Sequence, residues 1–154
     1  MAPGVWGLDK FELFKGLNPQ ELQEISKIIN KTLFKKGDII TNQSSKSRDV
    51  FLLIEGSVDI ISLNGVKLYR ISKGEIFGEL ALVPNLKRTA VAVARDDSWV
   101  LVMNINHLET FGEENPDVYK IISTNMVNSL GIKLARANKL IELLKTELAK
   151  NLRA

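Results

Sequence analysis

The stretch VFLLIEGSVDIISLNGVKLYRIS, residues 50–72, decides the fold prediction. It consists of short runs rich in β-branched and apolar residues, broken at Glu55-Gly56 and at Asn64-Gly65, which is the pattern of consecutive β-strands. Asn-Gly in a two-residue loop favours a type I′ hairpin. The register that this turn sets pairs three sets of residues across the two strands: Asp59 with Arg70, Ile61 with Leu68, and Leu63 with Val66.

Similar short segments continue the pattern on both sides, from Thr32 to about Met103. Turn residues separate them at Gly37-Asp38 and at Lys73-Gly74, and the segments TAVAVARDD and SWVLVMN add two further strands. Many short strands with glycine punctuation are typical of closed β architectures. The sequence therefore predicts a mainly β fold, a double-stranded β-helix (jelly-roll) barrel of about eight strands with flanking helices.

Helical patterns precede and follow the predicted strands. In LNPQELQEISKIINK, Asn18 is a predicted N-cap, the proline suits the first helical position, and Glu21 completes a capping box. The apolar stripe of this helix reaches Ile29. After the strands, Asn106 is predicted to cap a short helix, and Pro116 to begin a long one.

The long C-terminal helix carries apolar residues in alternating steps of four and three, which is a heptad seam. Its members are Leu130, Leu134, Ala137, Ile141, Leu144 and Leu148, and Leu140 and Leu143 widen it. Two interpretations are open: the seam packs on the chain's own barrel, or it forms a homodimer with a second copy. We therefore divide the chain into a lead-in (residues 1–8), a barrel with its N-terminal helix (9–115) and a C-terminal lid or dimerisation helix (116–154).

Composition limits the classes of function. The chain has no cysteine and one histidine, which excludes disulfides, thiolate metal sites and cysteine nucleophiles. The net charge of +3 is uneven, because Lys133–Arg153 holds six Lys or Arg and two Glu, a net of +4, which leaves −1 for the rest. Such a helical tail is more often a solvated face than a nucleic-acid arm. Without a signal-peptide pattern or an apolar run of about 18 residues, we expect a cytoplasmic protein.

The segment FGELALVPNLKRTA, residues 77–90, holds one acid, Glu79, and one arginine, Arg88, among mostly apolar and small residues. Gly78 permits a positive φ where a strand ends, and one helical turn can follow before Pro84-Asn85 stops it. The start of such a turn offers unpaired N–H groups to an anion. The two charged side chains would converge, the guanidinium on a phosphate and the carboxylate on a sugar hydroxyl. The alternative is a surface ion pair without function.

FGELAL, five residues and then RTA resembles the phosphate-binding cassette of the cyclic nucleotide-binding domain family. That family includes catabolite-activator-type regulators, regulatory subunits of cyclic-nucleotide-dependent kinases, and nucleotide-gated channels. KKGDIIT resembles the family's G-[DE]-x-I turn, and FLLIEGSVDI resembles its Y-x-I-x-x-G-x-V strand pair. The resemblance covers roughly residues 10–145. Ser44 and Arg95 depart from the pattern, where a glycine turn and an acid are common.

The resemblance implies a binding site for cAMP or cGMP. Arg88 would hold the exocyclic phosphate oxygens, and Glu79 the ribose 2′-hydroxyl. Thr89 permits cGMP without demanding it. The remaining residues that the resemblance implies are Gly78, Leu80, Ala81 and Ala90 around the phosphate and ribose, and Ile60 and Ile71 against the purine, for which the alternative is plain barrel core. The lid positions near Lys133 and Leu134 do not reproduce the activators' pair of hydroxyl residues.

Other classes of function fit the sequence less well. A cupin-type enzyme would need clustered histidines, and only His107 is present, so we predict no catalytic residue, no metal and no cofactor besides the nucleotide ligand. A complete transcription factor would need a recognition helix after the long helix, and we expect no DNA-binding domain in this chain.

The sequence thus predicts a non-enzymatic sensor or regulatory module. It would bind a cyclic nucleotide and signal through its last helix to a second copy or to an unidentified downstream protein. Two alternatives stay open: the chain is a nucleotide-binding fragment of a larger regulator, kinase or channel, or it is a degenerate β-roll that serves as an interaction scaffold.

Overall fold

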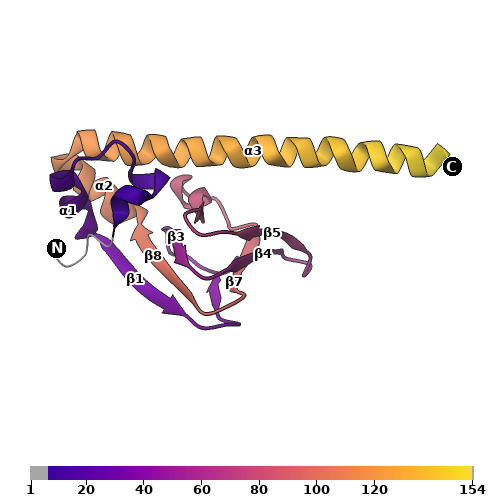
Figure 1. The fold of residues 1–154 in the computed structure, drawn as a ribbon, viewed down its shortest axis with the longest axis horizontal. Helices are drawn as coiled ribbons and strands as arrows, with labels where there is room; N and C mark the ends of the chain where they lie inside the picture. Colours follow the sequence, from indigo (N-terminus) through magenta and orange to yellow (C-terminus); the bar gives the residue numbers. More distant parts are fainter. Residues whose placement is uncertain (1–6, 154) are drawn as a thin grey trace.

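The computed structural model of the chain describes residues 7–153. Eight strands form two four-stranded sheets in which all neighbours are antiparallel (Figure 1). One sheet has the order β1 (Ile29–Phe34), β8 (Ser98–Asn104), β3 (Asp49–Glu55) and β6 (Ile76–Phe77). The other has the order β2 (Ile39–Thr41), β7 (Ala90–Ala94), β4 (Val58–Ser62) and β5 (Lys67–Ile71). The predicted mainly β fold of eight short strands is confirmed.

Helices lie at both chain ends and at one turn within the roll. The α-helices are α1 (Pro19–Ser26), α2 (Ile105–Glu114) and α3 (Pro116–Arg153), and the short 3₁₀ helices are η1 (Leu8–Lys10), η2 (Glu12–Phe14) and η3 (Glu79–Leu82). Residues 1–6 of the predicted lead-in lie outside the described residues. Leu8, at its end, is fully buried.

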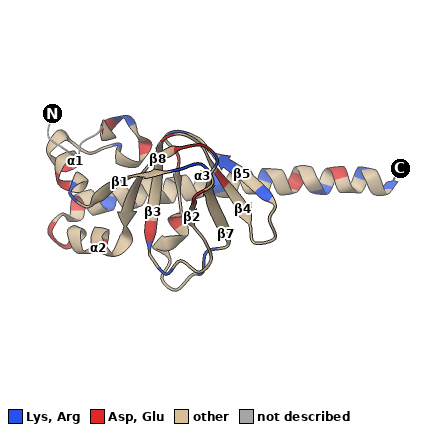
Figure 2. Cartoon of the chain, turned by 90° about the horizontal axis from the view of Figure 1, so that it is seen from below, with Lys and Arg blue, Asp and Glu red and all other residues tan. Residues whose placement is uncertain are grey.

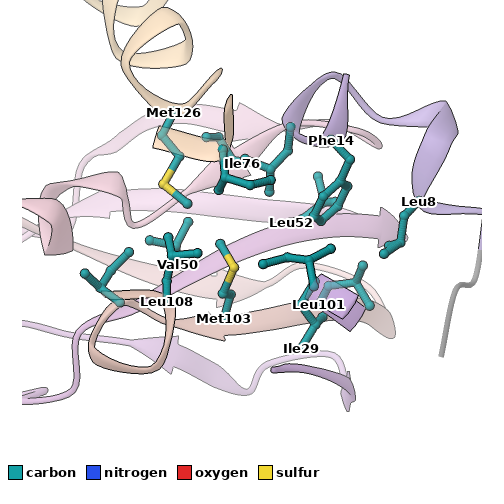
Figure 3. Packing of buried hydrophobic residues seen from close by; sticks show 14 of the residues in the cluster. Leu8, Phe14, Ile29, Val50, Leu52, Ile76, Leu101, Met103, Leu108 and Met126 are labelled. Carbon is teal, nitrogen blue, oxygen red and sulfur yellow. The ribbon is translucent and has the colours of Figure 1, made fainter. Parts of the chain in front are cut away.

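Two clusters of buried apolar side chains hold the molecule together. The first joins one sheet to the helices, and Leu52, Leu101 and Met126 belong to it (Figure 3). The second lies between the sheets and contains Phe51 and Leu53 of β3 together with side chains of β4 and β5. Successive residues of a strand point to opposite faces, so β3 supplies both clusters. This explains its nearly continuous apolar sequence.

The N-terminal capping box is confirmed. The Asn18 side chain accepts a hydrogen bond from the Glu21 N–H (2.8 Å), and the Glu21 carboxylate accepts one from the Asn18 N–H (3.0 Å). The predicted helix is too long, however, because α1 ends at Ser26 and Ile29 begins β1 opposite Met103. Ile29 is buried in the first cluster, so sheet pairing outweighs the helical period here.

The cap predicted for the second helix is wrong by two residues. Asn104, not Asn106, precedes α2, and its side chain accepts hydrogen bonds from the N–H groups of Asn106 (3.0 Å) and His107 (3.3 Å). The Asn106 side chain instead accepts a hydrogen bond from Arg48 Nη1 (2.8 Å). Two asparagines two residues apart carry the same local signal for an N-cap. That signal does not reveal the contact of Asn106 with Arg48, which is distant in the sequence.

The hairpin between β4 and β5 differs from the predicted type I′ turn. The Gly65 N–H donates to the Ser62 carbonyl oxygen (2.9 Å), and Gly65 has a φ of 84°. Among the described non-glycine residues only Asn85 has a positive φ, so Asn64 does not adopt the conformation that a type I′ turn requires. The loop therefore has three residues and closes with a left-handed glycine.

The longer loop changes the strand pairing near the turn. Ile61 lies opposite Lys67, so the predicted pairs of Ile61 with Leu68 and of Leu63 with Val66 are wrong. An irregularity next to Ile60 restores the register, and Asp59 lies opposite Arg70 as predicted. Arg70 Nε donates to Asp59 Oδ1 at 3.2 Å, and Lys67 pairs with the other carboxylate oxygen at 3.1 Å.

Helix α3 covers the roll with its first half and extends beyond it with its second (Figure 1). Val118, Ile122 and Met126 are buried in the first cluster. From Leu134 onward the seam is exposed to solvent, at 62% for Leu134 and 59% for Leu148. The interpretation that this part of the seam packs on the chain's own barrel is therefore wrong.

The exposed part of α3 also carries charges of both signs (Figure 2). Lys139 pairs with Glu142, and Lys150 pairs with Glu147, one turn apart. Within the described part of the chain, none of the helices combines the length and the apolar character that a membrane crossing requires.

Candidate functional site

The segment from Phe77 to Ala90 runs from β6 through η3 and back to β7. Gly78 has a φ of 78° and precedes η3, as the sequence predicts. A Cβ atom at this position would lie 3.0 Å from the Phe51 ring and 3.1 Å from the Asp49 carbonyl oxygen. The backbone conformation therefore favours glycine, and a side chain here would also be tightly packed. The chain turns back through Asn85, at a φ of 61°, consistent with the predicted turn.

This segment lines a cavity of about 90 Å³ next to the sheet formed by β2, β7, β4 and β5. Most of the residues that the sequence analysis assigned to the site meet there: Gly78, Glu79, Leu80, Arg88, Thr89, Ala90 and Ile60. Thr41, Tyr69, Phe77, Val91 and Ala92 complete the lining. A glycine, an acid, an arginine and small side chains thus converge from segments around one concave surface.

Arg88 is half-buried and held from the protein side. Its Nη2 atom donates to the main-chain oxygens of Ser47 (3.1 Å) and Asp49 (3.0 Å), and its guanidinium carbon lies 5.8 Å from the centre of the Phe51 ring. Burial lowers the pKa of Arg88, and the nearby charge of Asp49 opposes that shift. Arginine remains a cation at neutral pH, and its other N–H groups are available to an anion in the cavity.

Glu79 is only 4% exposed, and its ion pair is with Lys133 of α3. Lys133 Nζ donates to Glu79 Oε1 at 2.5 Å and to the Ile76 carbonyl oxygen at 2.5 Å. The hydroxyl of Ser129, one turn earlier on α3, donates to the same Oε1 at 3.0 Å. Glu79 and Arg88 therefore share the cavity, while the cation that compensates the charge of Glu79 comes from the long helix.

Two predicted residues do not line the cavity. Ile71 is 0% exposed and belongs to the cluster between the sheets, and Ala81 packs in the first cluster. Tyr69, two residues before Ile71, lines the cavity and lies opposite Ile60. Burial is the main cause that raises the pKa of Tyr69, and the charges of Glu79 and Glu75 raise it further. The Thr41 hydroxyl, buried in the cavity wall, has no hydrogen-bond partner among the described residues.

Sequence reasoning assigned no contacts to Ser129, Lys133, Thr41 or Tyr69. Lys133 was named only as a lid position, yet it approaches Glu79 across 54 residues of chain. The spacing of Ser129 and Lys133 places both on one face of α3. Two polar side chains four residues apart were the available signal, but their partner could not be identified from the sequence.

His107, the single histidine, lies exposed on α2, with its N–H bonded to the Asn104 side chain. Within residues 7–153, no three His, Cys, Asp or Glu side chains gather as metal ligands.

Comparison with known proteins identifies the family of the fold. The family described as Cyclic nucleotide-binding domain matches residues 31–115, more than half of the chain. The chain belongs to this family. The matched range contains the whole segment from Phe77 to Ala90, so the predicted resemblance is confirmed.

Two known proteins resemble this chain over part of their own length. The chain is 30% identical over 128 residues to the Pycsar effector protein BcPycTIR of Burkholderia cepacia, covering 82% of this chain and 39% of that one. It is 33% identical over 78 residues to a cGMP-dependent protein kinase of Toxoplasma gondii, covering 51% of this chain and 8% of the kinase.

Among solved structures, the catabolite activator protein of Thermus thermophilus superposes with a TM-score of 0.71 at 26% identity. The superposition covers 87% of this chain and 63% of the activator. The chain thus spans well under half the length of both sequence relatives described above.

Proposed function

We propose that this chain is a cyclic-nucleotide sensor that binds cAMP or cGMP and has no catalytic role. The observation that carries the proposal is the convergence of Arg88, Glu79 and the Gly78 turn on one cavity. Arg88 would bind the phosphate, since a guanidinium matches two phosphate oxygens. Glu79 would accept a hydrogen bond from the ribose 2′-hydroxyl. Ile60 and Tyr69 would contact the base, and Thr89 would contact the phosphate or a guanine.

The proposed signal passes through α3. Ser129 and Lys133 of this helix donate to Glu79, so a ligand bound to Glu79 would act on α3 through this carboxylate. The cavity of about 90 Å³ is smaller than the roughly 300 Å³ at which small-molecule pockets begin. Binding should therefore move a part of the wall. A ligand shifts a conformational equilibrium only when it contacts the two states differently, and α3 supplies such contacts.

The decisive test is titration of the purified chain with cAMP, cGMP and the linear 5′-monophosphates, followed by calorimetry. We expect at least one cyclic nucleotide to bind more tightly than its linear counterpart. A linear monophosphate carries about one more negative charge near pH 7 than a cyclic nucleotide. It also lacks the 3′,5′-cyclic phosphate ring, which would place both exocyclic phosphate oxygens on Arg88. Folded protein that binds no 3′,5′-cyclic nucleotide at millimolar concentration would contradict the proposal and favour the scaffold interpretation.

We also propose that the exposed seam of α3 joins two copies of the chain. The residues from Leu134 to Leu148 keep the heptad spacing and are exposed, and a row of apolar side chains on a helix of this length is stabilised by a second helix. The alternative partner is an unidentified downstream protein. If the chain is part of a longer regulator, the same seam could connect to that protein's next domain.

Leu144→Asp tests the homodimer. We expect the unsubstituted chain to sediment as a dimer and the variant to sediment as a monomer, because a buried aspartate without a cation is costly in a seam. The matched control is Leu63→Asp, which places the same charge on an exposed leucine of the β4–β5 hairpin. A monomeric unsubstituted chain, or equal masses for the chain and the Leu144→Asp variant, would contradict the proposal.

A further inference from the structure

The contact between α3 and the cavity is made at a single carboxylate oxygen. Ser129 Oγ (3.0 Å) and Lys133 Nζ (2.5 Å) both donate to Glu79 Oε1. Lys133 is in turn fixed by the Ile76 carbonyl oxygen at 2.5 Å, and its side chain is four-fifths buried. Two donors on one oxygen restrict rotation of the carboxylate. Among the described residues, both protein donors use Oε1, which leaves Oε2 for a ligand in the cavity.

The charges of the site support the same reading. A buried carboxylate is costly unless a cation pairs with it, and a phosphate in the same cavity would add a second negative charge nearby. Arg88 is bonded to the main-chain oxygens of Ser47 and Asp49 rather than to Glu79. With Lys133 included, the acid, the phosphate and the two cations sum to zero. Without it, a negative charge would remain in a place shielded from water.

We propose that Lys133 is a positioning residue that makes the site select ribose over 2′-deoxyribose. It holds the Glu79 carboxylate oriented so that Oε2 accepts the hydrogen bond of the 2′-hydroxyl, while Ser129 assists at Oε1. This inference rests on the proposed cyclic-nucleotide function and assigns a specificity role within it.

The contact between Lys133 and Glu79 also has an alternative interpretation, which predicts the opposite change in ligand affinity. If Lys133 blocked Glu79 in the empty protein and had to leave when ligand enters, its removal would strengthen binding. The additional bond to Ile76 favours the positioning role, because it keeps the ammonium group in place independently of Glu79.

The experiment measures affinities for cAMP, cGMP and their 2′-deoxy analogues. The proteins are the unsubstituted chain, Lys133→Met, Ser129→Ala and the control Lys139→Met, a lysine on the same helix that is exposed. We expect the unsubstituted chain to prefer the ribose form by about tenfold or more, as for a hydrogen bond to a charged acceptor. In Lys133→Met this preference should fall to about twofold, because the missing cation weakens all four ligands and the ribose ligands also lose the oriented acceptor. Lys139→Met should retain the full preference.

Each other outcome has a definite meaning. An unchanged ribose preference in Lys133→Met, or tighter binding of all four ligands, would overturn the positioning role while leaving the cyclic-nucleotide function intact. Ser129→Ala keeps the cation and removes the second donor, so it should show a smaller loss of ribose preference, and it provides the test if Lys133→Met does not fold. Absence of binding to the unsubstituted chain would instead overturn the proposed function and this inference with it.

Discussion

Replacing Arg88 by alanine should weaken cyclic-nucleotide binding by roughly thirtyfold to several-thousandfold. Arg88 lines the cavity and is the cation proposed to bind the phosphate, and truncating one partner of a buried charged pair costs about 2–5 kcal/mol, at ~1.4 kcal/mol per factor of ten. Calorimetry with cAMP and cGMP measures the change. Equal affinities in the variant and the unsubstituted chain would show that the phosphate is bound elsewhere.

The control for Arg88 must separate binding from folding, because its side chain also donates to the main-chain oxygens of Ser47 and Asp49. Lys87→Ala removes a neighbouring, exposed cation and should keep the affinity within about threefold of the unsubstituted chain. Water and salt screen the interaction of an exposed charge with the ligand. Arg88→Lys keeps the charge but loses the planar fork, so we expect an intermediate affinity. Thermal unfolding of all three variants shows whether the fold is retained.

The cassette could be predicted because its geometry is local. Gly78, Glu79 and Arg88 lie within eleven residues, and the turn that brings them together is encoded by Gly78 and by Pro84-Asn85. The strand pattern was predictable for the same reason, because alternation and turn residues act over a few positions.

The errors arise where a distant contact outweighs a local preference. The helical period of α1 continued to Ile29, but pairing with Met103 draws that residue into β1. Asn64-Gly65 is compatible with a two-residue and a three-residue loop, and the structure has the three-residue loop together with an irregularity next to Ile60 in the pairing of β4 with β5. Lys133 and Ser129 reach Glu79 only because α3 lies against this part of the roll, which no local pattern encodes.

The α3 seam shows a third case, in which the pattern is visible but its partner is not. The sequence contains the heptad spacing, and the structure shows that the chain's own roll does not cover the residues from Leu134 onward. A helix interface depends on a second surface, so the partner of the seam is identified only by measuring the oligomeric state of the protein.

Gly56→Ala should destabilise the fold by about 2–6 kcal/mol, from backbone strain and overpacking together. Gly56 joins β3 to β4 with a φ of 105°, where an L-residue is strained. An added Cβ would lie 2.3 Å from Ser98 Oγ and 2.6 Å from the Asp97 carbonyl oxygen. Ser98 cannot move aside cheaply, because it is fully buried and its hydroxyl bonds both the N–H and the carbonyl oxygen of Ser57.

Urea unfolding of Gly56→Ala measures this loss, and Gly65→Ala is its matched control. Gly65 also has a left-handed φ, at 84°, but nothing lies within 4 Å of its added Cβ. The control should lose only the cost of the left-handed conformation, about 1 kcal/mol. The difference between the two variants then isolates the close approach of the β3–β4 turn to Ser98. If both variants lose the same free energy of unfolding, the backbone conformation alone explains the requirement for glycine at Gly56. The β3–β4 turn would then pack less tightly against Ser98 than the structure shows.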